Sequence, residues 1–500
     1  MEEIRNFFIA FILIFLILVI WQYLFLPKPK IEKPKEEKAK ENLIVDTLKE
    51  VATKLDTIKE EEIVLENKKI KLTFSNLGGI LKSVYLKDYD CELLRKESRY
   101  FGLTILERDK KFNFNSELFQ YQKRDKEILF EARLASKQII KRYQLKDDYQ
   151  LSLTLAGLED SDNFFLNFDR FLNFTERDTS DELNYAHYQY YFKKELKKFD
   201  FKKMKENALI YEKEIKWLVM KNKYFLFALL PSFILDSCQF LKREREGGII
   251  IYSSNKKEIE LSFIFAPLEY NLLKSYKKDL EKAIPLGWPK SFSLAILFLL
   301  KFLYKIFQNY GVAIVFFAFL MKIIFFPFTR MQNEQMRKMQ LLQPKLEELK
   351  KKYKDDPQTL NRETMQLYQL YKINPFTGCL PLIIQLPVFW ALYSVFRQTI
   401  DLRKASFIFW IRDLSVKDPN YILPIVMGLF FLLQNILTNP DKKNIFLTFI
   451  FPIFLTLIFL NFPSGLQLYW LTFNLLSILE SLIFQKGGLK WQKIKVKPGP

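Results

Sequence analysis

Side chains suited to catalysis are scarce in this sequence. Its 500 residues include one histidine, His187, and three widely separated cysteines, Cys91, Cys238 and Cys379. One histidine excludes the H-E-x-x-H metalloprotease motif, and the cysteine spacing indicates neither a C-x-x-C metal site nor a disulfide framework. The sequence also lacks G-x-S-x-G, Walker A and G-x-G-x-x-G motifs. We therefore expect no enzymatic activity, no metal and no cofactor.

One ionisable residue stands out by its surroundings. Lys322 lies within VAIVFFAFLMKIIFFPF, and a cation at the centre of a membrane helix costs about 2.5–3.5 kcal/mol on insertion scales. Two interpretations are open. The lysine can snorkel towards the membrane surface that Arg330 marks, or it can face a water-filled cavity that opens on the same side.

Isolated polar residues in other hydrophobic segments bear on this choice. They are Gln385, Gln434, Gln467, Asn474 and Glu480. Each alone is typical of a packing hydrogen bond between membrane helices, whereas together with Lys322 they would line a hydrated groove. The aromatic residues Phe389 and Trp470 are typical of packing or lipid contact, because aromatic residues make up 16% of the chain.

These residues lie within long hydrophobic segments of the sequence. Such segments predict a membrane protein. Residues 1–26 read as a retained anchor, since the apolar run is too long for a signal peptide and lacks a small-x-small cleavage site. Five further spans are predicted at 311–328, 380–396, 421–437, 445–462 and 466–484. Several are short, so the surrounding membrane could be locally thinned.

A large β-rich domain is predicted between the anchor and the spans. Residues 27–60 form a charged, proline-containing linker, and residues 61–285 read as a β-sandwich. Ile70, Leu72 and Phe74 alternate with polar residues, as on a strand with one buried face. Residues 249–252 and 259–265 read as the two strands of a hairpin.

The sequence pattern of residues 286–309 predicts an amphipathic helix that lies in the membrane interface. Lys301, Lys305 and Gln308 recur on one stripe of an otherwise apolar segment. A true membrane span is the alternative.

A basic helical hairpin is predicted at residues 331–373. Apolar residues repeat at three- and four-residue steps on both sides of Asp356-Pro357, a good N-cap followed by a good first helical residue. The cations of this hairpin that we single out are Arg337, Lys338, Lys350, Lys351 and Lys352.

Two charge signals disagree on orientation. The basic hairpin favours the cytoplasm, which places both termini there and the β domain outside. The first anchor argues the reverse, because Arg5 precedes it while Lys28 and Lys30 follow. We give the short basic loop more weight, because long domains cross the membrane largely regardless of charge. The net charge of +20 suits nucleic acid, a ribosome or an anionic membrane equally.

Four strings resemble the YidC membrane-protein insertase family. They are MQLLQPKLEELKKKY, NPFTGCLPLIIQLPVFWALY, FWIRDLSVKDPNYILPI and FPSGLQLYWLTFN. The resemblance runs over about residues 287–484, and the anchor and β domain resemble the Gram-negative bacterial type. It implies a polytopic α-helical membrane protein with six transmembrane helices and a large periplasmic β-sandwich domain. Five helices, over residues 310–485, would form the insertase core, and residues 486–500 would be a basic cytoplasmic tail.

The resemblance also implies roles for single residues. Lys322 matches a groove position that is usually arginine in the family, so the charge is kept and the forked guanidinium is lost. The expected substrate groove comprises Lys322, Gln385, Gln434, Trp470 and Asn474. The expected apolar slide for substrate helices comprises Leu386, Phe389 and Ile458.

The implied function is insertion and folding of nascent membrane proteins in the bacterial inner membrane, alone or with the Sec translocon. Expected partners are nascent membrane proteins, the ribosome, the Sec translocon and membrane lipids, with no small-molecule substrate. A transporter or channel that uses Lys322, and a structural anchor for the β domain, are the alternatives.

Overall fold

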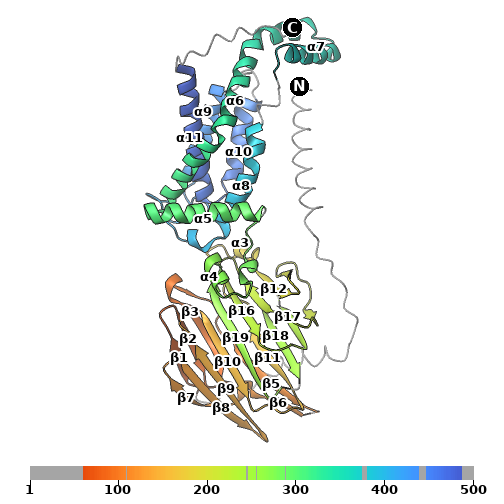
Figure 1. Cartoon of the computed structure of the whole chain (residues 1–500), viewed down its shortest axis with the longest axis vertical. Coiled ribbons are helices and arrows are strands. Elements are labelled where there is room, and N and C mark those ends of the chain that lie inside the picture. Colours follow the sequence, from red (N-terminus) through yellow and green to blue (C-terminus); the bar gives the residue numbers. More distant parts are fainter. Residues whose placement is uncertain are drawn as a thin grey trace. The chain divides into compact units, whose positions relative to one another are not determined.

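A computed structural model describes residues 60–108, 110–243, 246–254, 256–287, 289–373, 380–438 and 446–486. The predicted anchor at 1–26, the linker up to residue 59, Cys379 and the tail beyond Lys486 lie outside these residues. The chain divides into two compact units, and the boundary between them falls at Ile284 and Pro285. Figure 1 shows a β unit and a helical unit.

The β unit contains two antiparallel sheets. The first has the order β1 (Glu62–Glu66), β2 (Ile70–Ser75), β3 (Ile80–Leu86), β5 (Tyr100–Glu107), β11 (Asp162–Asp169), β18 (Glu246–Ser254), β17 (Ser237–Arg243) and β14 (Ala208–Ile210), with β4 (Cys91–Glu92) on β3 and β6 (Lys110–Asn113) on β5. The second has the order β13 (Glu195–Asp200), β12 (His187–Phe192), β15 (Trp217–Lys221), β16 (Phe225–Pro231), β19 (Glu258–Pro267), β10 (Gln150–Ala156), β9 (Lys137–Leu145), β8 (Glu127–Leu134) and β7 (Gln120–Arg124).

Short helices complete the β unit. They are η2 (Lys87–Tyr89), η3 (Phe114–Ser116), α3 (Thr179–Leu183), α4 (Tyr270–Ser275) and η4 (Leu280–Ala283).

An aromatic core joins the two sheets. Phe101 of the first sheet packs against Phe263 of the second, with ring centroids 4.7 Å apart, and Phe168 lies 5.2 Å from Phe227. The predicted inward face of β2 is correct, since Ile70, Leu72 and Phe74 are fully buried. Alternation thus predicts the buried face, and the sandwich prediction is confirmed.

The predicted hairpin of residues 249–252 and 259–265 is wrong. Strand β18 pairs with β11 and β17 in the first sheet, whereas β19 pairs with β10 and β16 in the second. The chain changes sheet between Ser254 and Glu258. Alternation shows that each segment is a strand, but it does not identify the partner strand.

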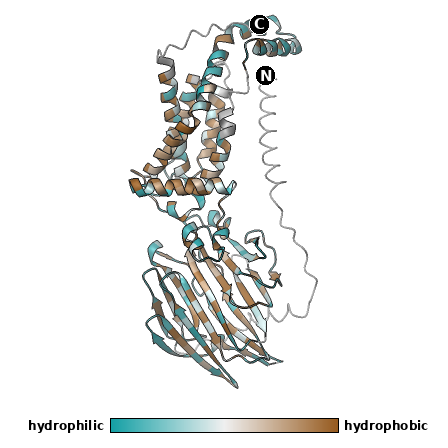
Figure 2. Ribbon diagram, in the orientation of Figure 1, coloured by the Kyte–Doolittle hydropathy of each residue, from teal (hydrophilic) through white to brown (hydrophobic). Residues whose placement is uncertain are grey.

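The helical unit contains five long helices, two shorter ones and two irregular turns in its described part. They are α5 (Lys290–Phe307), α6 (Tyr310–Lys352), α7 (Pro357–Leu370), α8 (Leu380–Gln398), η6 (Ile400–Leu402), α9 (Ile422–Thr438), the π-helical turn η7 (Phe446–Ile450), α10 (Phe451–Phe459) and α11 (Ser464–Lys486). Figure 2 shows that hydrophobic residues dominate α5, α8 and α10 and that hydrophilic ones gather on α7.

Helix α6 combines the first predicted core span with the first helix of the predicted hairpin. It continues for 43 residues and contains Pro327 and Pro344. A proline in a membrane helix removes one hydrogen bond without necessarily ending the helix. The sequence therefore gives both segments correctly but not their continuity. The second hairpin helix is α7, whose predicted cap is present, with Asp356 accepting from the Thr359 amide at 3.1 Å.

Helix α5 is amphipathic as predicted, but Lys301 does not belong to its exposed polar face. The Lys301 ammonium lies 3.0 Å from the Asp401 carboxylate of η6, and 17% of its side chain is exposed. Lys305 is exposed, beside the exposed apolar residues Phe302 and Ile306. One predicted interfacial cation therefore fixes the helix to the loop after α8.

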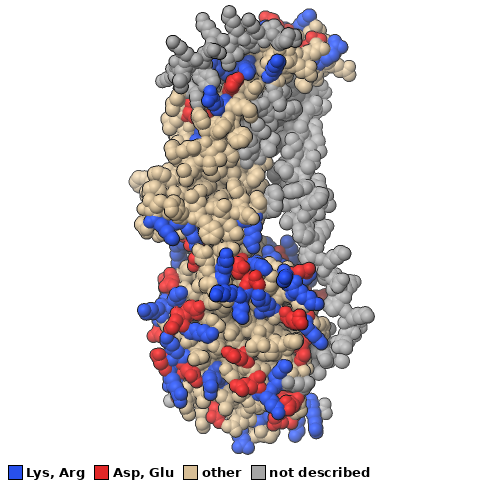
Figure 3. All heavy atoms as spheres, viewed as in Figure 1, with Lys and Arg blue, Asp and Glu red and all other residues tan. Residues whose placement is uncertain are grey.

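By length and composition, two helices of the described residues could cross a membrane, at Tyr310–Met339 and Ser464–Ile483. Shorter apolar helices lie at Ile422–Leu437 and Thr448–Phe459. On the face shown in Figure 3, charged side chains are sparse over the middle of the helical unit and gather near α7.

Candidate functional site

Helix α11 brings the candidate site together. It packs against α6, α8 and α9. Asn474, Ser477 and Glu480 are at most 8% exposed although they are polar. Their spacing of three residues, with Trp470 four residues earlier, places them along one side of the helix. This polar stripe faces an otherwise apolar bundle.

Lys322 of α6 ends on this stripe. Its Nζ lies 2.6 Å from Glu480 Oε2, donates to Ser477 Oγ at 2.8 Å, and lies 4.9 Å from the centre of the Phe473 ring. The other carboxylate oxygen, Glu480 Oε1, accepts from Thr329 Oγ1 at 2.9 Å. The lysine is 8% exposed. Its ammonium is thus buried inside the bundle, on a carboxylate that also accepts from Thr329, the residue before Arg330.

Two polar atoms of this stripe have no hydrogen-bond partner among the described residues. They are the side-chain nitrogens of Trp470 and Asn474. Unpaired buried polar groups are costly, and water satisfies them when space allows. The unpaired atoms therefore favour a hydrated environment along the stripe.

Two of the glutamines have hydrogen-bond partners among the described residues. Gln385 of α8 donates to the Tyr469 hydroxyl at 2.6 Å, and Gln467 donates to the carbonyls of Phe459 and Phe462. Such bonds join neighbouring helices, as expected for single polar residues in membrane spans. Gln434 lies half-buried on α9, which also packs against α11.

The predicted slide residues have different surroundings. Phe389 contacts Phe459 and Trp470, with centroids 6.0 and 5.9 Å away, and Leu386 is half-buried. Ile458 on α10 is 40% exposed. A long apolar substrate could meet Ile458 directly, whereas Phe389 is part of an aromatic cluster.

The basic residues of the hairpin lie mostly on its surface. Arg337 is exposed, as are Lys350, Lys351 and Lys352 in the last turn of α6, and Lys338 pairs with Glu334 at 3.0 Å. Buried Leu342 and Leu346 give the hairpin a small apolar core.

Residue patterns alone do not indicate Ser477, Thr329 or Tyr469 as site residues. They mark Glu480 as an isolated polar group in a hydrophobic segment but do not identify it as the partner of Lys322. The polar stripe of α11 at helical spacing is a signal that could have suggested the pairing.

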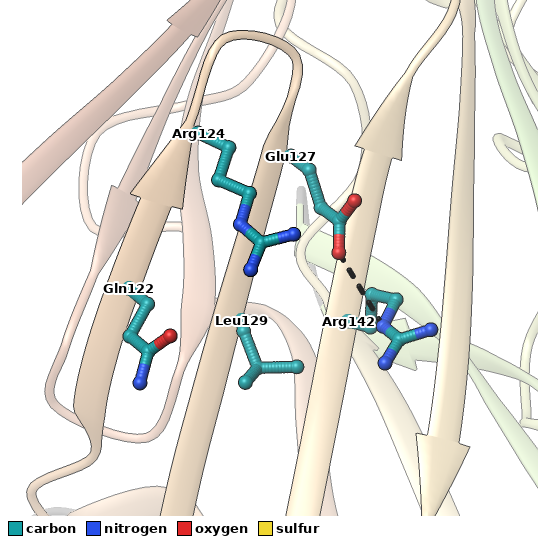
Figure 4. Close-up of a pocket in the computed structure, with 5 residues that line it drawn as sticks. All are labelled: Gln122, Arg124, Glu127, Leu129 and Arg142. Atoms are coloured by element: carbon teal, nitrogen blue, oxygen red, sulfur yellow. Dashed lines mark ion pairs between the residues drawn. The ribbon is translucent and has the colours of Figure 1, made fainter.

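The β unit offers a weaker candidate. Gln122, Arg124, Glu127, Leu129 and Arg142 line a shallow depression of about 70 Å³ on β7, β8 and β9, as Figure 4 shows. The ion pair there joins Glu127 and Arg142 at 3.4 Å, and 56% of the arginine side chain is exposed. Burial lowers the pKa of His187 to about 4. Among the described residues, no cluster of His, Cys, Asp or Glu could hold a metal ion.

Fold and site together define an α-helical membrane protein with a large β-sandwich domain. Residues 62–300 match the family model described as YidC periplasmic domain, and residues 302–491 match the one described as 60Kd inner membrane protein. The chain belongs to the YidC membrane protein insertase family.

Curated relatives carry the same family name. The chain is 42% identical over 284 residues to the membrane protein insertase YidC of Geobacter metallireducens, covering 54% of this chain and 53% of that protein. It is 41% identical over 287 residues to that of Syntrophus aciditrophicus, covering 55% and 52%. The chain thus spans about half the length of the curated relatives it matches.

Solved structures with similar arrangements include a crystal structure of active YidC insertase with its first transmembrane domain resolved. The identity is 19% and the TM-score 0.42, over 86% of this chain and 94% of that one. A galactose mutarotase-like protein from Lactobacillus casei is 10% identical with a TM-score of 0.32, over 41% of this chain and all of that one.

Proposed function

We propose that this protein inserts nascent membrane proteins into the bacterial inner membrane and assists their folding, without catalysis. The observation that carries the proposal is the Lys322 cation, which lies among polar side chains inside an apolar bundle. Such a charge is costly in lipid and is therefore expected to serve a function. Family membership and the names of the relatives support the proposal.

In this account the groove attracts the polar or acidic extracytoplasmic segment of a substrate. Its residues are Lys322, Gln385, Gln434, Trp470 and Asn474. The apolar helix of the substrate then passes along Leu386, Phe389 and Ile458 into lipid. Partitioning of apolar surface into the bilayer supplies the driving force, and the lysine supplies electrostatic attraction.

The topology follows the positive-inside rule. We place the hairpin at 331–373 and both termini in the cytoplasm, and the β domain at 61–285 in the periplasm. Residues 1–26 would be the first of six transmembrane helices, residues 27–60 a linker, and 286–309 an interfacial helix. The core would be 310–485 and the tail 486–500.

The proposed partners follow from the exposed surfaces. The hairpin, with its exposed cations, would receive nascent chains near the ribosome. The β domain would dock partners such as the Sec translocon, and the outer apolar faces of the helices would contact lipid.

Insertion of a single-span reporter with an acidic extracytoplasmic tail, into liposomes containing the purified full chain, tests the proposal. We expect Lys322→Arg to retain insertion and Lys322→Glu to reduce it about tenfold or more, the equivalent of about 1.4 kcal/mol. Lys305→Gln, at an exposed residue of α5, is the matched control. Unchanged insertion by Lys322→Glu would contradict the groove mechanism, and a Lys322-dependent solute flux would favour a transporter.

A further inference from the structure

The Lys322 ammonium already has an anionic partner inside the protein. Glu480 lies 2.6 Å away, and the two side chains are 10% and 8% exposed. An acidic residue of a substrate that approached Lys322 would meet a site occupied by a carboxylate of the same chemistry. The cation is therefore available to a substrate only if Glu480 gives way.

The pair joins two helices through side chains alone. Lys322 and Thr329 both project from α6 and hold the two oxygens of Glu480 on α11. Buried pairs with excellent geometry contribute little net stability, because desolvation offsets most of the attraction. Breaking such a pair is costly, however, because it leaves one charge buried without its partner. A substrate carboxylate must therefore take the place of Glu480 on Lys322, and water must reach the released Glu480.

Thr329 makes the exchange reversible. Its hydroxyl donates to Glu480 Oε1 at 2.9 Å, independently of the lysine. When Glu480 releases Lys322, this hydrogen bond still stabilises one carboxylate oxygen and keeps the side chain close to the lysine. The displaced anion therefore returns once the substrate leaves.

We infer that Glu480 is an internal counter-ion that a substrate carboxylate must displace from Lys322. It thereby sets how much negative charge a translocated segment needs. This inference rests on the proposed insertase function. A substrate tail with one acidic residue only exchanges the Glu480 carboxylate on Lys322 for another. A tail with two or more acidic residues adds net attraction to Lys322, because each unit charge adds its own Coulomb term.

Reporters with zero, one, two and three acidic residues in the translocated tail test this inference in the liposome assay. For the wild type we expect insertion to rise steeply between one and two acidic residues. For Glu480→Gln we expect the rise between zero and one acidic residue. This variant should insert the reporter with one acidic residue about tenfold better than the wild type does. For Lys322→Gln with Glu480→Gln, insertion should be independent of tail charge.

Asp401→Asn is the matched control, because it removes the carboxylate partner of Lys301 in the same helical unit, outside the groove and the hairpin. Glu480→Asp keeps the charge and shortens the side chain, so its threshold should lie between those of wild type and Glu480→Gln. It also serves if Glu480→Gln fails to fold. Wild-type and Glu480 variants with the same charge threshold would overturn the inference. Failure of the wild type to insert any reporter would instead contradict the proposed function.

Discussion

Each unit of this protein buries a lysine, and the partners differ in kind. In the β unit, Lys141 of β9 donates to the carbonyl oxygens of Gly78 and Phe101 at 2.7 and 2.8 Å. In the helical unit, Lys322 contacts the side chains of Glu480 and Ser477. Backbone carbonyl groups cannot leave without distorting the chain that carries them, whereas side chains can rotate away.

This difference indicates which buried lysine can exchange one anionic partner for another. Lys141 links the two sheets of the sandwich and is fully buried, so its role is structural. Lys322 lies in a stripe with unpaired polar atoms and has one anionic partner, which fits a site where partners alternate. Burial of a lysine is therefore not enough to indicate function.

Removing the exchangeable lysine alone should produce the largest effect. Lys322→Met leaves Glu480 buried without its cation, so we expect the helical unit to lose about 3–5 kcal/mol of unfolding free energy. Unfolding in mixed detergent micelles measures this loss. Lys322→Met with Glu480→Leu should recover most of it, and a cost under about 1 kcal/mol for the single variant would mean that the pair is already hydrated.

Removing the fixed lysine should have a smaller effect confined to the β unit. Lys141→Met leaves neutral carbonyls unpaired but no buried charge, so we expect a loss of about 1–3 kcal/mol. Hydrogen exchange of the β strands in the full chain reports it. Reporter insertion at a temperature where the variant stays folded should equal that of the wild type, and an insertion defect there would show that the two lysines do not differ in role.

The stability of the β unit should depend on pH through its buried lysines, which extends the comparison between Lys141 and Lys322. Burial lowers the pKa of Lys141 from 10.5 to about 7, and burial does the same to Lys221. Above pH 7 the unfolded chain then binds more protons than the folded chain, so stability rises with pH towards 10. We expect a rise of about 1 kcal/mol between pH 7 and 9, because the carbonyl acceptors of Lys141 offset part of the burial effect.

Exchange rates corrected for their intrinsic pH dependence measure this slope. Lys141→Met should reduce it, while Lys126→Met, at an exposed ion pair with Asp147, should not. A stability that does not change between pH 7 and 9, in the wild type and in Lys141→Met alike, would show that Lys141 stays charged throughout, held by its carbonyl acceptors.

The smallest effect on stability should come from a substitution in the helical hairpin, away from both buried lysines. Asp356→Ala removes the cap of α7, at a cost of about 1 kcal/mol that is confined to this helix. Faster amide exchange in the first turn of α7, with unchanged exchange in α11, is the expected result. Asp355→Ala, at the neighbouring residue, is the control.

Some of this organisation could be predicted from residue patterns. Alternation at Ile70, Leu72 and Phe74 gives a correct buried face, and Asp356-Pro357 gives a correct helix start. The partner of β18 could not be predicted, because strand patterns carry no information on which strands pair across the sandwich. The continuity of α6 could not be predicted, because Pro327 and Pro344 usually indicate a break in a helix.

The candidate site could be predicted only in part, because residue patterns do not show which helices pack together. Lys322 stands out because its surroundings are apolar, and that signal is local in sequence. Its pairing with Glu480 depends on how α6 packs against α11, over a separation of more than 150 residues. Lys301 shows the same limit, since its place on a helical stripe does not predict the ion pair with Asp401.

Crosslinking of a stalled nascent chain tests the central claim most directly. Photoreactive side chains at Leu386 and Ile458 of the full protein should capture the transmembrane segment of a ribosome-bound substrate, and one at Asn474 should capture its polar extracytoplasmic segment. Leu429, an exposed apolar residue of α9 that lies outside the proposed path, should not. Capture at Leu429 as strong as at the other three positions would contradict a defined groove and slide.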